Sequence, residues 1–110
     1  AAPVTFYEFF HSTNDATLRS LDRLRELTDK SGAKLRIVVL AKESAERVAP
    51  ILRDYISPRA GVMFDPEGRA FMACGGRDLP FGVLVDARNR VLWMGNSLKF
   101  DREILNQVTK

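Results

Sequence analysis

The first half of the chain alternates two kinds of hydrophobic pattern. Residues 4–10 and 34–40 are runs of aliphatic, β-branched and aromatic side chains, typical of strands buried on both faces. Between them leucines recur every three residues among charged side chains, at Leu18, Leu21, Leu24 and Leu27. This spacing predicts an amphipathic helix that begins after the short polar side chains of residues 12–15 and ends near Gly32.

A second helix is predicted after the second strand, with Ser44 as its N-cap. Its apolar positions fit the helical period: Ala45, Val48, Ala49, Leu52, Tyr55 and Ile56. Pro50 removes one helical hydrogen bond. We therefore expect either a kink at Pro50 or a helix that begins later than Ser44.

The second half predicts shorter elements. Residues 61–64 form a short strand, and 65–68 have the residue preferences of a type I turn. A brief helix at 69–74 ends at a glycine pair, and the apolar runs 81–85 and 91–94 have the spacing of an antiparallel hairpin. A last helix places four apolar side chains on one face and two acids in its first turn: Phe100, Ile104, Leu105 and Val108, then Asp101 and Glu103.

The element order predicts one α/β domain over residues 1–110. Strands that alternate with helices imply parallel pairing, whereas the late hairpin implies an antiparallel edge. We therefore expect a mixed sheet with helices on both faces. Because the strand pattern begins as early as Val4, a targeting segment or a further domain upstream of Ala1 remains open.

The counts of cysteine and histidine limit the kinds of redox and metal site that the chain can form. The 110 residues include one cysteine, Cys74, and one histidine, His11. A single cysteine cannot form an intrachain disulfide or a CxxC pair, and one histidine excludes a multi-histidine centre. We therefore expect no metal and no cofactor. The longest apolar run, residues 37–41, is far shorter than the roughly 20 residues that span a bilayer.

Net charge does not indicate a nucleic-acid partner. The chain carries 17 Lys and Arg against 14 Asp and Glu, a formal net charge of +3. The basic residues are interleaved with acids along the whole chain, whereas a nucleic-acid footprint gathers them on one element. We interpret them as a solvated surface and expect no nucleic-acid binding.

Three motifs in this order resemble the thioredoxin fold over nearly the whole chain, and most closely the TlpA-like and ResA-like redoxin branch of thiol-disulfide oxidoreductases. Residues 9–17, Phe-Phe-His-Ser-Thr-Asn-Asp-Ala-Thr, stand where that family has an aromatic strand end and W-C-x-x-C. Residues 65–68, Asp-Pro-Glu-Gly, match its D-x-x-G turn, and residues 75–91 resemble G-x-x-x-x-P, an apolar strand and D-x-x-G/N-x-[IV].

The resemblance implies a three-layer α/β/α fold around a mixed sheet, a cis peptide bond at Leu79–Pro80, and a function in cell redox homeostasis. It also implies further residues before the first strand, and it favours export to the bacterial periplasm. A single free cysteine is equally compatible with the cytoplasm, so the compartment remains open.

The chain departs from this family at the reacting residues. In the alignment the two cysteines are replaced by Asn14 and Thr17, with Asp15 and Ala16 between them, and the tryptophan is replaced by Thr13. A thiolate at a helix N-terminus attacks a disulfide and a second cysteine resolves the product, which Asn and Thr cannot do. Asparagine is a strong helix N-cap, so the helix start keeps its structural role. The pattern is that of a pseudo-enzyme.

Two other side chains have both a functional and a structural interpretation. Cys74 is a reactive thiol if it lies at the same end of the sheet as Pro80 and near Arg77. Otherwise it is a small packed side chain at a helix end. His11 is a proton donor or lone metal ligand at a strand end, or an incidental polar residue, since it has no obvious carboxylate or cysteine ligand set and Asp15 alone is not a constellation.

With the dithiol site absent, the resemblance indicates a peptide-binding groove as the leading candidate site. In proteins of this fold, the backbone before the cis-proline pairs with an extended peptide at the helix N-terminus, without need of cysteines. Here that surface comprises Thr13, Asn14, Asp15, Leu79, Pro80 and Phe81. We therefore predict a non-catalytic domain that binds a protein or peptide. The alternatives are a one-cysteine thiol oxidoreductase or peroxide-reactive protein that uses Cys74, and a Pro80 that merely fixes a loop.

Overall fold

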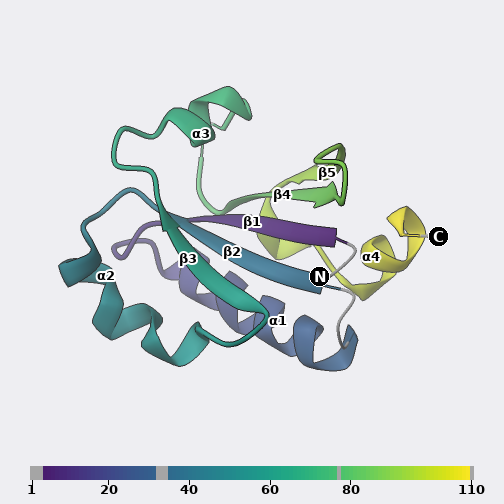
Figure 1. Cartoon of the computed structure of the whole chain (residues 1–110), viewed down its shortest axis with the longest axis horizontal. Helices are drawn as coiled ribbons and strands as arrows, with labels where there is room; N and C mark the ends of the chain where they lie inside the picture. The colour runs from purple at the N-terminus through teal and green to yellow at the C-terminus, as the bar shows by residue number, and fades with distance from the viewer. Residues whose placement is uncertain (1–3, 32–34, 77, 110) are drawn as a thin grey trace.

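The computed structural model describes residues 4–31, 35–76 and 78–109, and in them the strands form one mixed sheet with the order β3-β2-β1-β4-β5. The strands are β1 (Val4–Phe10), β2 (Leu35–Ala41), β3 (Ala60–Phe64), β4 (Phe81–Asp86) and β5 (Val91–Gly95). β1, β2 and β3 pair in parallel, whereas β4 is antiparallel to both β1 and β5. The predicted strands and late hairpin are thus confirmed, with ends shifted by a residue (Figure 1).

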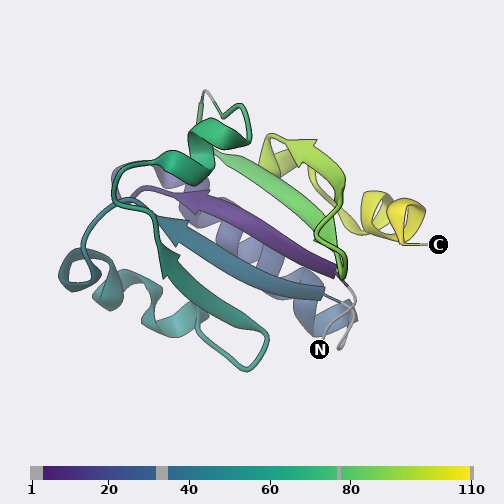
Figure 2. The same ribbon diagram turned by 45° about the horizontal axis from the view of Figure 1, so that its top comes forward.

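The helices cover both faces of this sheet. They are α1 (Asp15–Ser31), α2 (Ala45–Leu52), α3 (Arg69–Ala73) and α4 (Arg102–Val108), with 3₁₀ turns η2 (Arg53–Tyr55) and η3 (Ser97–Lys99). α1, α2 and α4 share one hydrophobic cluster with the sheet, and α3 packs into a separate cluster on the opposite face (Figure 2). The predicted three-layer α/β/α fold is confirmed. No helix in the described ranges is long and apolar enough to cross a membrane.

The second helix corrects three details of the prediction. It begins at Ala45, directly after Ser44, so the later start is wrong, and Pro50 lies inside it. Ser44 makes no side-chain cap; instead, its carbonyl accepts hydrogen bonds from the N–H groups of Arg47 and Val48. Of the predicted apolar face only Val48 and Leu52 are fully buried, and Ala45, Ala49 and Ile56 are exposed. The helix therefore contacts the core mainly through these two side chains, which lie one turn apart.

The larger cluster is centred on three aromatic rings between the sheet and α4. The ring centroid of Phe6 is 4.7 Å from that of Phe100 and 6.0 Å from that of Trp93, and Trp93 lies 5.1 Å from Phe100. Phe6 also passes directly over Gly82 on β4, where a Cβ would overlap the ring. Such aromatic packing joins β1 firmly to β4, β5 and the chain that leads into α4.

The smaller cluster on the α3 face supports the far end of β1. The ring centroid of Phe9 is 5.2 Å from that of Phe71 and 5.6 Å from that of Phe81. The ring centroids of Phe71 and Phe81 are 5.7 Å apart, and the two rings meet edge to face. Leu40, Val83 and Val85 are buried with them. This cluster holds α3, the end of β1 and the start of β4 together.

Candidate functional site

The loop between β1 and α1 is closed by its own side chains. Asn14 Oδ1 accepts a hydrogen bond of 2.9 Å from the Ala16 N–H, which confirms the predicted N-cap. Thr17 is completely buried, and its Oγ1 lies 2.7 Å from the carbonyl oxygen of Asn14 and 3.1 Å from that of His11. Both residues at the cysteine positions of the alignment therefore stabilise the start of α1.

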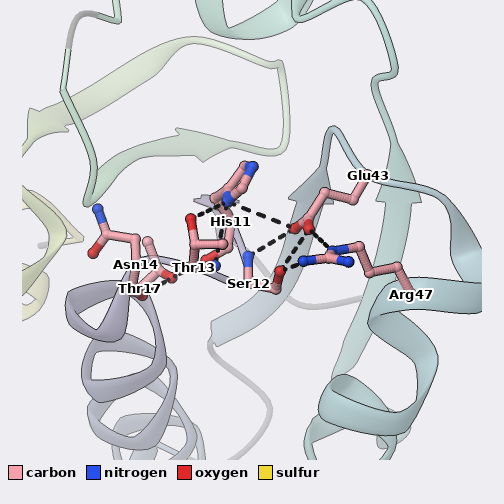
Figure 3. Close-up of polar contacts among 7 residues, drawn as sticks. All are labelled: His11, Ser12, Thr13, Asn14, Thr17, Glu43 and Arg47. Carbon is pink, nitrogen blue, oxygen red and sulfur yellow. Dashed lines mark hydrogen bonds and ion pairs between the residues drawn. The ribbon is translucent and has the colours of Figure 1, made fainter.

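Glu43 fixes the same loop from the end of β2, as Figure 3 shows. Its two carboxylate oxygens accept hydrogen bonds from the Ser12 N–H at 2.7 Å and from Ser12 Oγ at 2.6 Å. Arg47 Nε donates to Oε2 at 2.7 Å. Burial would raise the pKa of Glu43, but the hydrogen bonds from Ser12 and Arg47 outweigh it, so the pKa lies below its ordinary value.

Sequence reasoning missed this contact. Ser12 and Glu43 are 31 residues apart, and only the parallel pairing of β1 with β2 brings their strand ends together. The one local signal is the i,i+4 spacing of Glu43 and Arg47, which is common in exposed helices.

His11 makes mainly local contacts. Its Nδ1 lies 2.8 Å from Thr13 Oγ1 and accepts a long hydrogen bond of 3.3 Å from the Thr13 N–H, and it is 4.0 Å from Glu43 Oε1. Among the described residues no group of three or more His, Cys, Asp or Glu side chains is placed to hold a metal.

Cys74 lies at the C-terminal end of α3, half-buried against the smaller aromatic cluster. Burial raises the pKa of its thiol. Arg77, the cation that the sequence argument placed near it, lies outside the described residues. The thiol that the structure describes is therefore a packed side chain with less thiolate than a free cysteine.

The predicted groove residues come from two segments that meet at one end of the sheet. Phe81 is paired with Phe9, so the residues before β4 run beside the end of β1, from which Thr13, Asn14 and Asp15 follow. The Leu79–Pro80 peptide bond is cis. Neither the N–H nor the C=O of Leu79 takes part in a backbone hydrogen bond with another described residue. Among the described residues, the backbone groups of Leu79 are therefore without a backbone partner.

A cavity that sequence reasoning did not foresee opens beside Leu79, with a volume of about 420 Å³. It lies among the ends of β1 and β2, the turn at 65–68 and α3. Its walls include the apolar side chains of Phe9, Phe10, Leu40, Phe71, Met72 and Leu79. Leu79 thus belongs both to the predicted groove and to the cavity.

The sequence matches no protein-family model and no curated protein. Solved structures do match the fold. A thioredoxin-like protein of Aeropyrum pernix has a TM-score of 0.80 and 16% identity, over 98% of this chain and 76% of that one. An exposed lipoprotein thioredoxin of Streptococcus pneumoniae has a TM-score of 0.74 and 16% identity, over 98% of this chain and 84% of its own.

A thiol-disulfide isomerase of Corynebacterium glutamicum is similar to the same extent, with a TM-score of 0.74 and 13% identity over 97% of this chain and 78% of that one. At such identities the similarity concerns the architecture and not the chemistry. Together with the sheet order, these structures show that the chain has the thioredoxin-like fold.

Proposed function

We propose that this domain binds an extended peptide along the edge formed by Thr13, Asn14, Asp15, Leu79, Pro80 and Phe81, and that it carries out no dithiol–disulfide exchange. The main-chain edge at Leu79 carries the proposal. Its N–H and C=O lack backbone partners among the described residues, and an added peptide strand would supply them. Unpaired backbone groups of this kind are the usual sites of strand addition.

The side chains at the cysteine positions support the second half of the proposal. Dithiol exchange requires a thiolate at the helix start and a second thiol three residues later. Asn14 and Thr17 instead use their polar atoms in hydrogen bonds within the loop and the first turn of α1. Cys74, with a pKa raised by burial, is a weak nucleophile by comparison.

Two assays test the proposal. In the first, an array of capped octapeptides is screened against the whole chain, and bound peptides are titrated into ¹⁵N-labelled protein. Amide shifts are expected at Thr13, Asp15, Leu79 and Phe81. Leu79→Glu should abolish binding, whereas Val91→Glu adds the same charge at an exposed residue of β5 that pairs with Val85, near the opposite end of β4, and should not.

The second assay measures reduction of insulin disulfides with dithiothreitol, which should not exceed the uncatalysed rate. Turnover that Cys74→Ser abolishes would overturn the non-catalytic proposal in favour of a one-cysteine redox protein. Thiol titration gives an independent measure: Cys74 should react slowly in the folded chain and rapidly after denaturation, because it packs against the smaller cluster.

A further inference from the structure

We propose that the cavity beside Leu79 receives one large apolar side chain of the bound peptide, and that an acidic residue two positions away from it, on the same face of the extended peptide, pairs with Lys42. This inference rests on the proposed peptide-binding function and specifies which peptides are bound.

The floor of the cavity is apolar and already formed. Phe9, Phe10 and Leu40 are buried beneath it, and the ring of Phe71 is held edge-on against Phe9. A volume of about 420 Å³ accommodates a leucine, methionine or phenylalanine side chain. Met72 borders the opening and is 73% exposed, so its flexible thioether is free to fold over an inserted group.

One cation at the rim, Lys42, is available to an anionic group of the peptide. Both carboxylate oxygens of Asp65 already accept hydrogen bonds of 3.0 Å, from the N–H groups of Arg69 and Ala70. Glu67 pairs with Arg69 at 2.6 Å. Lys42 lies along Gly68 at the same rim and forms no ion pair with any side chain in the described ranges. Its ammonium group is therefore available to an anionic group of a ligand.

The cavity is continuous with the proposed groove. Leu79 supplies the main-chain edge, and its side chain forms part of the cavity wall. Successive side chains of an extended peptide point to opposite faces, so a peptide paired at Leu79 directs alternate side chains toward the cavity. The residues two positions before and after the inserted one face the same side and pass the rim where Lys42 lies.

The test uses three capped pentapeptides: acetyl-Asp-Ser-Phe-Ser-Asp-amide, the same peptide with Ala in place of Phe, and the same peptide with Lys in place of both Asp. Each is titrated into the whole chain labelled with ¹³C at the methionine methyl groups. The chain has three methionines, of which Met72 lines the cavity and Met94, on β5, serves as the control. The Phe peptide should shift the Met72 methyl signal and leave that of Met94 unchanged.

The affinities distinguish the two contacts. Replacing Phe by Ala should weaken binding at least about tenfold. Lys42→Glu should weaken binding of the Asp-containing peptide about fivefold and strengthen binding of the Lys-containing one. Lys99→Glu makes the same change at an exposed lysine of η3 and should alter neither.

Three results would overturn the inference in different ways. If the Phe and Ala peptides bind equally and Leu79→Glu abolishes both, the groove stands but the cavity stays empty. If no peptide of the array or of this set binds, the groove and the cavity proposals both fail. If free N-acetylphenylalanine shifts Met72 as strongly as the peptide does and Leu79→Glu has no effect, the cavity is a small-molecule site and not a peptide pocket.

Discussion

Glu8 on β1 and Ser97, 89 residues further along the chain, are joined by a buried hydrogen bond in which Ser97 Oγ donates to Oε1 at 2.8 Å. Ser20 on α1 donates to the other carboxyl oxygen. Glu8 has no exposed surface, and burial raises its pKa to about 8 in spite of the two hydroxyl groups. A neutral carboxyl group therefore links β1, α1 and η3 within the core.

Stability should fall as pH rises from about 4.5 to about 8. In this window the folded chain holds a proton on Glu8 and the unfolded chain has released it, so rising pH favours unfolding. The slope from this group is at most about 1.4 kcal/mol per pH unit. Urea unfolding at several pH values should show the slope in the wild type and lose it in Glu8→Gln, which is neutral throughout. An unchanged slope in the variant would assign it to other groups.

Loss of the Glu43 carboxylate should loosen the loop before α1. Glu43→Ala leaves the half-buried Ser12 N–H and Oγ without their partner, which costs about 1–3 kcal/mol of unfolding free energy. Hydrogen exchange at the Ser12 amide should accelerate in parallel. Glu67→Ala is the matched control, because Glu67 is exposed and its ion-pair partner within the described part of the chain is the exposed Arg69, and it should change stability by less than about 1 kcal/mol. Equal effects of the two substitutions would contradict the anchoring role.

Two glycines in strands should respond oppositely to alanine. A Cβ at Gly82 overlaps the Phe6 ring and lies 3.3 Å from Ser97 Cβ, so Gly82→Ala should destabilise the fold by about 1–3 kcal/mol. At Gly61 nothing lies within 4 Å, and Gly61→Ala should be neutral or stabilising by up to about 1 kcal/mol. Thermal unfolding of the two variants checks both signs, and a Gly82→Ala variant as stable as the wild type would show that Phe6 moves freely.

The order of elements could be predicted from the sequence because its signals are local. The hydrophobic run of β1, the residue preferences of the turn that begins at Asp65 and the N-cap at Asn14 each depend on neighbours a few residues away. Ser44 shows the limit even here, because its position at the helix start was predictable but its side chain does not cap the helix.

The site was predictable only in part, because several of its contacts join segments distant in the chain. The groove residues were inferred from a family resemblance, and the pairing of Phe9 with Phe81 does bring their two segments to one end of the sheet. The anchoring of Ser12 by Glu43 and the cavity beside Lys42 depend instead on where separate strands end and on how α3 packs. No periodicity encodes such relationships.

Replacing Asn14 and Thr17 together by cysteine tests whether they occupy the dithiol positions. They are adjacent in space, since the Thr17 N–H donates to the Asn14 carbonyl at 3.0 Å, and the start of α1 favours a thiolate. In a Cys74→Ser background, Asn14→Cys with Thr17→Cys should show two thiols after reduction and none after mild oxidation, and should accelerate insulin reduction above the uncatalysed rate. The control pairs Asn14→Cys with Arg19→Cys, an exposed residue five positions along α1, and should keep both thiols. If the first pair also stays reduced, Asn14 and Thr17 do not stand where a dithiol site would form, and the proposed absence of dithiol exchange requires another explanation.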